Sequence, residues 1–546
     1  MRRLEIVYFI CLLFCFKSIS LLGQNIIPHP NKLINKGGFL DLGKKVNIVQ
    51  REASEEASLL KGYLLEDFNI VSQEKKKGQF KSITLKVEKN KENELGEEGY
   101  LLDVNDNGIV ISAAARAGVF YGVQTLRQLI KRNDNSLTIS IPRVYVEDRP
   151  RFKWRAFMLD EGRYFKGGKV VKKMLDEMAL LKMNTFHWHL TEDQGWRIEI
   201  KKYPKLTEIG SKRDSTQIGS WPTGWKSNEF DGKPHSGYYT QEEIKDIIKY
   251  ASARHITIIP EIEMPGHSTA AIAAYPWLGT DRTPQNVPVA FGGPMAVQKV
   301  LNVTDPKVRS FLHDVLDEVM ALFPSKIIHI GGDEVKYDVW RNSSKVMSYM
   351  EEQGFPSPAA LQVWFTNSIS NYLASKGRRM MGWNEIMGKK LDAGADEKDH
   401  LVEDNLAPNT VVHVWKGDLN LAVQAAENGY DIVNSYYAHT YFDYDYKTIP
   451  LKKVYDFNPV PKGLDSKYHN KILGMGCQMW SEWVPDEEIL GRQVFPRIAA
   501  AAEVGWTDSS SKNYEVFTKG LPYFFQRWDR LGITYYNPKK MTSNAN

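Results

Sequence analysis

The sequence predicts an α/β protein in which a (β/α)8 barrel is preceded by a small α+β domain. From Trp154 onward, short apolar segments alternate with amphipathic segments whose apolar residues recur at helical spacing. There are eight such apolar segments, and eight parallel strands close a barrel of this kind. An open doubly wound sheet is the alternative, but no glycine-rich phosphate-binding loop follows the first segment.

The composition is that of an ordinary globular protein and argues against several classes of partner. The chain has 546 residues, of which 42% are hydrophobic and 25% charged, a length suited to two to four domains. Its 71 basic and 66 acidic residues leave a net charge of +5, so nothing calls for a nucleic-acid or anionic membrane partner. The 14 Trp and 26 Tyr could stack on sugar rings, although large cores also use aromatic residues.

Residues 1–23 have the pattern of a secretory signal peptide. Two arginines precede an apolar run over residues 6–16, and small residues follow up to Gly23. The run is too short for a comfortable membrane span, so we predict no stable membrane insertion. An uncleaved anchor is the alternative interpretation.

Cysteine usage indicates which compartment an exported form of this protein would suit. Cys11 and Cys15 lie inside the predicted signal, so the mature chain keeps only Cys477 and cannot form an internal disulfide. An exported protein without disulfides is more typical of a bacterial periplasm or exterior than of a lysosome. We therefore predict a periplasmic or secreted bacterial protein.

Residues 24–148 are predicted to form the small α+β domain. Alternating segments such as Ser82–Val87 and Gly108–Ala113 indicate strands joined by turns rich in Asn, Asp and Gly. A helix follows, with apolar residues at helical spacing from Val119 to Ile130. No cluster of acids, histidines or cysteines suggests chemistry here, so we predict a structural role for this domain.

Residues 149–546 are predicted to form the barrel, its last helix and a loose tail. Helices such as Glu242–Ala253 fall between the strands. The spacing is uneven because residues 205–240 and 275–300 are long insertions, which barrels usually carry as substrate-shaping loops. The predicted strands are Trp154–Leu159, Thr185–Leu190, Ile256–Ile262, Ile327–Ile330, Arg379–Trp383, Val411–Trp415, Asp431–Ser435 and Ile472–Trp480.

The segment Ile327–Ile330 runs into two glycines and two adjacent acids, Asp333 and Glu334. This pattern is typical of a buried parallel strand that ends at a functional surface. Neighbouring side chains on a strand point to opposite faces. Two adjacent carboxylates are therefore poorly placed to flank one bond as nucleophile and acid, which need to lie about 5 Å apart on opposite sides of it. One acid can reach the bond while the other has a different role.

Residues 329–334, His-Ile-Gly-Gly-Asp-Glu, resemble the His-x-Gly-Gly-Asp-Glu signature of family 20 glycoside hydrolases, the β-N-acetylhexosaminidases. In that family the Glu protonates the leaving oxygen and the Asp orients the substrate's acetamide group, which is the nucleophile. The resemblance implies these roles for Glu334 and Asp333. It extends over both predicted domains and rests on several motifs in the same order.

The stretch after the second predicted strand allows two interpretations. His187 and His189 share one strand face, as zinc ligands can, and His267 or Glu263 could in principle supply a third ligand. The resemblance explains the stretch better, because residues 189–197 are similar to the family's His-Leu-Thr-Asp-Asp-Gln-Gly-Trp-Arg. We therefore predict no metal and no cofactor, with a metal site as the alternative.

The same motif implies a support for the catalytic acid. The family's second Asp has this role and corresponds to Asp193, while Glu192 replaces the first Asp. Residues 261–267 resemble the family's Glu-x-Asp-x-Pro-Gly-His, with Glu263 in place of the Asp. A histidine beside a buried acid tunes the proton affinity of that acid, so His267 is predicted to be catalytic.

Arg163 follows the first predicted strand and carries a fixed fork of donors suited to vicinal sugar hydroxyls. A structural ion pair is the alternative for this residue. In the family the matching Arg holds the 3- and 4-hydroxyls of the sugar. The resemblance likewise assigns a sugar hydroxyl to Asp443 and the 4- or 6-hydroxyl to Glu482.

Aromatic residues are predicted to enclose the substrate. Trp383, Trp415 and Trp480 end the fifth, sixth and eighth strands, and they match tryptophans that surround the N-acetyl group and stack on the sugar in the family. A single tryptophan at a strand end is more often a core residue, but three at one barrel mouth favour a site. Tyr441 matches the tyrosine whose hydroxyl holds the acetamide carbonyl.

The sequence therefore predicts an exo-acting β-N-acetylhexosaminidase that acts on glycans or chitooligosaccharides ending in β-linked GlcNAc or GalNAc. One alternative is the same chemistry on a disaccharide or sulfated terminus, as in lacto-N-biosidases. Another is a sugar-binding protein that has lost catalysis, against which the intact Asp333, Glu334, Tyr441 and His267 argue. The sequence does not indicate the oligomeric state.

Overall fold

The computed structural model describes residues 25–73, 80–132, 139–293, 295–388 and 406–537. The predicted signal peptide and the end of the predicted tail lie outside these ranges. Among the described helices, none has both the length and the apolar character needed to cross a membrane.

Eight parallel strands form a closed barrel in the order β10-β15-β16-β17-β18-β19-β20-β9. All eight predicted strands are confirmed, each end within one residue of its predicted position. In β9 every residue is buried, because helices cover the outside of the barrel and side chains fill its inside. The barrel strands are β9 (Trp154–Asp160), β10 (Thr185–His189), β15 (Thr257–Glu261), β16 (Ile327–His329), β17 (Arg379–Trp383), β18 (Val411–Val414), β19 (Asp431–Asn434) and β20 (Ile472–Met479).

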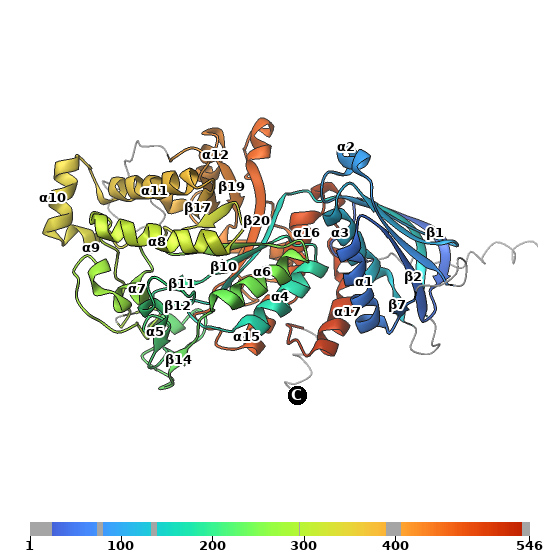
Figure 1. Ribbon diagram of the computed structural model, residues 1–546, viewed down its shortest axis with the longest axis horizontal. Helices are drawn as coiled ribbons and strands as arrows, with labels where there is room; N and C mark the ends of the chain where they lie inside the picture. The colour runs from blue at the N-terminus through green and yellow to red at the C-terminus, as the bar shows by residue number, and fades with distance from the viewer. Residues whose placement is uncertain (1–24, 74–79, 133–138, 294, 389–405, 538–546) are drawn as a thin grey trace, which may run out of the picture.

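Helices cover the outside of the barrel (Figure 1), and three of the six main ones begin with a capping side chain. Thr240 and Glu243 form a capping box at the start of α6, and Asp305 caps α8 ahead of Pro306. The main outer helices are α4 (Gly168–Leu180), α6 (Gln241–Ser252), α8 (Pro306–Leu322), α11 (Pro358–Ser375), α12 (Asn420–Glu427) and α16 (Arg497–Trp506).

Shorter elements lie in the connections, and one short helix and one strand pair among them fall within the predicted insertion at residues 205–240. The short helices are α5 (Lys205–Glu208), α7 (Thr269–Ala274), α9 (Tyr337–Arg341), α10 (Ser344–Gln353), α13 (Tyr437–Thr440), α14 (Leu451–Tyr455) and α15 (Glu487–Val494). Two small antiparallel pairs are β11 (Thr191–Glu192) with β12 (Gly195–Trp196), and β13 (Lys212–Arg213) with β14 (His235–Ser236).

The N-terminal domain is a mixed sheet in the order β1-β8-β5-β6-β4-β2-β3, with β7 paired to β8. Its helices α1 (Ser54–Phe68) and α3 (Arg116–Leu129) lie between this sheet and the barrel (Figure 1). The strands are β1 (Lys32–Asp41), β2 (Lys45–Arg51), β3 (Val71–Ser72), β4 (Ser82–Val87), β5 (Tyr100–Asn105), β6 (Gly108–Ala113), β7 (Lys131–Arg132) and β8 (Ile139–Asp148), with a single helical turn α2 (Glu92–Leu95). The two predicted strands and the predicted helix of this domain are confirmed.

Buried polar contacts join the two domains. The Lys182 ammonium, just after α4, lies 2.9 Å from a carboxylate oxygen of Asp148 at the end of β8, and both side chains are fully buried. Tyr100 donates a hydrogen bond of 2.7 Å to Asp148, and the Trp506 indole donates to it at 3.0 Å. Lys182 lies just before the amino end of β10. These contacts are therefore at the face of the barrel opposite the carboxyl ends of the strands, where barrel enzymes build their sites.

The C-terminal segment differs from its prediction. The last barrel helix, α16, already ends at Trp506, and residues 514–531 form a separate helix, α17 (Tyr514–Leu531), instead of completing the last helix. The guanidinium of Arg527 on α17 lies 3.1 Å from Asp67 of α1 and 2.9 Å from Glu177 of α4. This helix therefore ties the N-terminal domain to the barrel, which local periodicity could not indicate.

Candidate active site

The eleven predicted site residues all lie at or just beyond the carboxyl ends of barrel strands, and together they come from all eight strands. Contacts between the described side chains connect them into one site, as the following paragraphs describe. The residues are Arg163 after β9, Asp193 after β10, His267 after β15, Asp333 and Glu334 after β16, Trp383 at the end of β17, Trp415 after β18, Tyr441 and Asp443 after β19, and Trp480 and Glu482 after β20.

The loop after β16 carries Asp333 and Glu334 in a left-handed backbone stretch. Gly331, Gly332 and Glu334 have φ angles of 67°, 88° and 47°. Residue 331 must be a glycine, because a Cβ atom there would lie 1.7 Å from a carboxylate oxygen of Glu263. The Asp333 side chain is 11% exposed and the Glu334 side chain 36%. The two neighbouring acids therefore occupy different environments.

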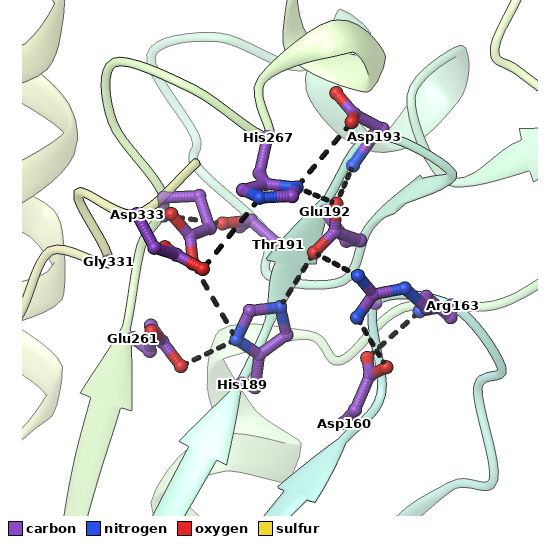
Figure 2. A network of polar contacts seen from close by, with 12 residues as sticks. Asp160, Arg163, His189, Thr191, Glu192, Asp193, Glu261, His267, Gly331 and Asp333 are labelled. Atoms are coloured by element: carbon purple, nitrogen blue, oxygen red, sulfur yellow. Dashed lines mark hydrogen bonds and ion pairs between the residues drawn. The ribbon is translucent and has the colours of Figure 1, made fainter. Parts of the chain in front are cut away.

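His267 lies between Asp333 and Glu192, as Figure 2 shows, and Glu334 is a further neighbour. Its Nε2 is 3.7 Å from Asp333 and 3.8 Å from Glu334, and its Nδ1 is 2.7 Å from Glu192. Burial lowers the pKa of His267, but the carboxylates of Glu192 and Asp333 outweigh it and raise the pKa well above its ordinary value. The ring is therefore an imidazolium at neutral pH, a fixed positive charge beside the acids.

The carboxyl group of Asp333 has a pKa close to neutral pH. Burial raises the pKa of its carboxyl to about 7, and the charges of Glu334 and Glu261 add to this effect while His267 opposes it. Its buried Oδ1 has no hydrogen-bond partner among the described residues. An unpaired buried carboxylate oxygen can accept a hydrogen bond from an N–H group of a ligand.

Both acids of the predicted support motif contact His267, but Glu192 is the nearer. Asp193 lies 3.5 Å from His267 Nδ1 and accepts hydrogen bonds from the backbone and hydroxyl of Thr269. Glu192, at 2.7 Å from the same nitrogen, also lies 3.2 Å from the Arg163 guanidinium. The longer Glu192 side chain therefore links the histidine to the arginine, a contact that the motif comparison did not assign.

Glu261 organises the histidines that could have been metal ligands. Its carboxylate lies 2.5 Å from Nδ1 of His189 and 2.9 Å from nitrogens of His187 and His329. It also accepts a hydrogen bond of 2.8 Å from the Trp383 indole. Burial favours the protonated acid, but the three histidines outweigh it and hold the pKa of Glu261 well below its usual range.

Three sets of side chains have the geometry to hold a metal ion. In two of them Glu261 is already paired with histidines, and the third contains the His267 imidazolium. Burial lowers the pKa of His189, but Glu261 outweighs it and raises the pKa to about 10. A metal ligand must be a neutral imidazole, so the raised pKa values of His189 and His267 disfavour a metal in the two sets that contain them. In the remaining set, burial lowers the pKa of His329 to about 4, so that ring is neutral and contacts Glu261 without a charge of its own. The sets are His187–Glu261–His329, His189–Glu261–Glu263 and Glu192–Asp193–His267.

Arg163 is surrounded by three carboxylates, so the structural ion pair considered for it is present. Its guanidinium lies 3.0 Å from Asp160, 3.2 Å from Glu192 and 3.4 Å from Glu482, and it stacks over the Trp480 ring at 5.1 Å. These contacts hold the fork beside a tryptophan at the mouth of the barrel, where it can also meet sugar hydroxyls.

The aromatic residues form a continuous wall. The Trp480 ring centroid lies 5.8 Å from that of Trp383 and 6.0 Å from that of Tyr441. Trp415 is stacked nearly parallel to Tyr441, with centroids 5.8 Å apart and planes 8° apart. The buried Trp480 Nε1 and Asp443 Oδ1 have no partner in the described part of the chain, so a ligand can satisfy them.

Two known protein-family models match this chain. The model described as glycosyl hydrolase family 20, catalytic domain, matches residues 152–509, and that of domain 2 of the same family matches residues 23–149. The chain belongs to glycoside hydrolase family 20. Its relatives include the β-hexosaminidase of Porphyromonas gingivalis, 35% identical over 94% of this chain and 65% of that protein, and the β-hexosaminidase of Vibrio furnissii, 35% identical over 75% and 66%. The chain thus spans about two thirds of the length of these relatives.

Solved family 20 structures share the fold. The exo-β-N-acetylglucosaminidase of Vibrio harveyi in complex with N-acetylglucosamine superposes with a TM-score of 0.79 at 29% identity, covering 94% of this chain and 78% of that one. The β-N-acetylhexosaminidase of Bacteroides fragilis gives 0.76 at 31% identity, covering 94% and 97%. The fold prediction, a (β/α)8 barrel after a small α+β domain, is confirmed.

Sequence reasoning missed one acid of this family 20 site, the half-buried Glu385, and named a second, the buried Glu263, without assigning it a role in the site. The Glu385 carboxylate accepts a hydrogen bond from the Trp415 indole, with its oxygens at 2.9 and 3.1 Å. Glu263 has both oxygens buried and without a hydrogen-bond partner among described residues; burial first, then the charges of Asp333 and Glu261, raise its pKa well above the usual range. Glu385 comes two residues after Trp383, so its place at a strand end was the available signal.

The two predicted insertions interlock at the rim of this family 20 barrel. The buried Gln217 of the first accepts hydrogen bonds from the backbone N–H groups of Phe291 and Gly292 in the second. A Cβ atom on Gly224 would lie 2.6 Å from the Trp483 ring, next to Glu482.

An aromatic contact anchors the tip of the first insertion on a second loop. The Trp221 ring lies 4.0 Å from that of Tyr444, next to Asp443. The insertions therefore rest on the two loops that carry Asp443 and Glu482.

Proposed function

We propose that this chain is an exo-acting, retaining β-N-acetylhexosaminidase that releases terminal β-linked GlcNAc or GalNAc from the non-reducing ends of glycans or chitooligosaccharides. Membership of family 20 supports the reaction class. Relatives named β-hexosaminidase and N,N'-diacetylchitobiase, and structural neighbours solved with GlcNAc, support the substrate class.

The observation that carries the proposal is the division of environments between Asp333 and Glu334. Asp333 is buried with an unpaired oxygen, whereas Glu334 is the more exposed of the two. One acid can therefore receive the acetamide N–H while the other reaches the leaving oxygen. The nucleophile is then the acetamide oxygen of the substrate itself.

In the proposed first step, the acetamide oxygen attacks the anomeric carbon as the bond to the leaving oxygen breaks. Glu334 gives its proton to that oxygen, and Tyr441 donates a hydrogen bond to the attacking oxygen. The ionised Asp333 stabilises the positive charge that develops on the acetamide nitrogen of the oxazolinium. Holding the two reacting atoms together makes the attack intramolecular, an effect of up to about 7–11 kcal/mol when well oriented.

In the second step, water opens the oxazolinium from the face that the leaving group vacated. Glu334, now ionised, takes a proton from the water, so the β configuration is retained. Arg163, Asp443 and Glu482 hold the sugar hydroxyls throughout. Asp193 and Glu192 keep the His267 imidazolium beside both catalytic acids.

A comparison of two substrates tests the proposal. The aryl glycoside of GlcNAc should be hydrolysed, and the matching glucoside, which lacks the acetamide, should be a very poor substrate even when saturating. A GlcNAc-thiazoline, which mimics the oxazolinium, should inhibit strongly. Glucoside turnover close to that of the GlcNAc glycoside would mean that the protein supplies its own nucleophile.

A disaccharide or sulfated terminus is the second candidate for the substrate. The interlocked insertions speak against a second sugar, because they rest on the loops that bear Asp443 and Glu482. A sugar-binding protein without activity is the remaining alternative. Hydrolysis of a chromogenic GlcNAc glycoside excludes it, and a glycan panel separates the substrates.

We also propose that the protein is exported to a bacterial periplasm or exterior after loss of residues 1–23. The N-terminal domain (24–148) and the barrel with its C-terminal part (149–546) would then form the mature enzyme. Mass spectrometry should find a mature N-terminus near Gln24 and no internal disulfide. An intact Met1 on membrane-bound protein would indicate an anchor instead.

A further inference from the structure

The loop that carries the two catalytic acids has few backbone contacts of its own. Between Gly332 and Val335, the described residues supply a single hydrogen bond to the backbone, which the Gln362 side chain donates to the Gly332 carbonyl at 2.7 Å. Up to Gly331 the chain is well held, since the Trp383 N–H donates to the Gly331 carbonyl at 2.9 Å. The backbone hydrogen bonds to neighbouring strands therefore stop at Gly331, two positions before Asp333.

The local conformation makes this lack of support important. Glycines at two consecutive positions leave many backbone states open to the chain. Glu334, in contrast, occupies the left-handed region, which disfavours a residue with a side chain. A loop that is flexible before the acids and strained at one of them needs an external contact to keep a single geometry.

Gln362, on α11, supplies that contact at both ends of the loop. Its amide N–H group binds the Gly332 carbonyl, and its amide oxygen accepts a hydrogen bond of 2.6 Å from the Tyr337 hydroxyl at the start of α9. Gln362 is 1% exposed, so water does not compete with these bonds. Burial raises the pKa of Tyr337, which keeps its hydroxyl protonated as the donor.

We propose that Gln362 is a positioning residue for the reaction: its side-chain amide ties Gly332 to Tyr337 and thereby sets the directions of the Asp333 and Glu334 carboxylates. The inference rests on the proposed function of these two acids. In this orientation of the Gln362 amide, its N–H group donates to one partner and its oxygen accepts from the other. A residue of similar size without hydrogen-bonding groups would free the Gly332 peptide while filling the same space.

The test compares three variants with wild type on a natural linkage, chitobiose, and on the dinitrophenyl glycoside of GlcNAc. Gln362→Met removes both hydrogen bonds at similar volume, and Tyr337→Phe removes one of them. Thr366→Val is the matched control, because Thr366 is a buried residue of the same helix whose hydroxyl has no partner among the described residues.

Gln362→Met should lower kcat on chitobiose about 10- to 100-fold, the scale of a displacement of about 1 Å. The loss should be smaller on the dinitrophenyl glycoside, which needs less help from the acid, and KM and Tm should change little. Tyr337→Phe should show a smaller loss of the same kind. The double variant should resemble Gln362→Met, since both changes act through one amide. Thr366→Val should behave as wild type.

Unchanged kcat in Gln362→Met would overturn the proposal, and so would an equal loss on both substrates that follows a lowered Tm. If Gln362→Met does not fold, Tyr337→Phe decides, with unchanged kcat on chitobiose again overturning it. Failure of the proposed function would appear differently, because wild type itself would then fail to hydrolyse the GlcNAc glycoside.

Discussion

Adjacent residues can lie in different chemical environments, as Asp333 and Glu334 show. The backbone turns into the left-handed region at Gly331, Gly332 and Glu334, so the two carboxylates leave the strand end in different directions. Asp333 lies in a buried, unpaired position and Glu334 in a partly exposed one. Each acid can therefore act on a different part of one sugar.

Glu334→Gln tests the general acid. The amide cannot donate a proton in the same way, and general acid catalysis contributes about 10²- to 10⁴-fold in rate. Chitobiose cleavage should fall by that amount, whereas the dinitrophenyl glycoside, whose leaving group needs no proton, should lose much less. The measurement is kcat/KM on both substrates; a matching loss on the two would reject Glu334 as the acid.

The pH dependence tests Asp333. Its proposed role needs the ionised carboxylate, and burial raises its pKa to about 7, so protonation inactivates the enzyme as the pH falls through neutrality. The acid limb of kcat/KM should therefore lie near pH 7, well above the ordinary range of an aspartic acid. Asp333→Asn should lose most of the rate and also this limb. If kcat/KM of Asp333→Asn still falls as the pH drops through 7, a titratable group other than Asp333 causes that fall.

At the scale of elements, the strand ends bring the site residues together and the insertions pack on two of the loops that carry them. Each barrel strand supplies at least one site residue, because parallel strands present their carboxyl ends at one face. The tip of the first insertion packs Gly224 against Trp483 and Trp221 against Tyr444. The loops that bear Asp443 and Glu482 are therefore held from outside the barrel.

Gly224→Val should disturb this rim. A Cβ atom at residue 224 would lie 2.6 Å from the Trp483 ring, so the insertion or the tryptophan must move, and Glu482 with it. Contacts made equally in the bound and transition states should be lost, which raises KM about tenfold with a smaller effect on kcat. The exposed neighbour Lys226 provides the control, and Lys226→Ala should keep wild-type kinetics. Unchanged KM in Gly224→Val would show that the rim does not shape the pocket.

At the scale of the whole molecule, buried contacts join the N-terminal domain to the barrel. The buried Lys182–Asp148 pair and the contacts of Arg527 on α17 join the two at positions away from the strand ends. The domain interface should therefore influence stability without influencing chemistry.

Lys182→Met tests this separation. Removing one partner leaves Asp148 buried with less compensation, a change that typically destabilises a protein by about 3–5 kcal/mol. Thermal unfolding should shift to lower temperature, while kcat and KM at 25 °C remain those of wild type. Lys173→Met, which breaks the partly exposed pair with Glu487, should change stability by no more than about 1 kcal/mol. Equal Tm for Lys182→Met and wild type would contradict the assigned role of the pair.

The sequence by itself determined the fold class, all eight barrel strands to within one residue, and the strand-end positions of the predicted site residues. Local periodicity and strand-end motifs carry this information, because each depends on residues close together in the chain. For the same reason the order of the motifs identified the family. The residues expected to act on the substrate could be named before any contact between them was known.

Only the tertiary structure decided which partners these residues have. Glu192 rather than Asp193 lies nearer to His267, Glu385 holds Trp415, and Gln362 holds the loop of the two acids. Residues 514–531 form a helix that ties the domains together, which the pattern of that segment does not show. These contacts join side chains far apart in the sequence, and they depend on distances of a few tenths of an ångström that no local pattern encodes. The pKa of Asp333 has the same origin, since burial and neighbouring charges exist only once the chain has folded.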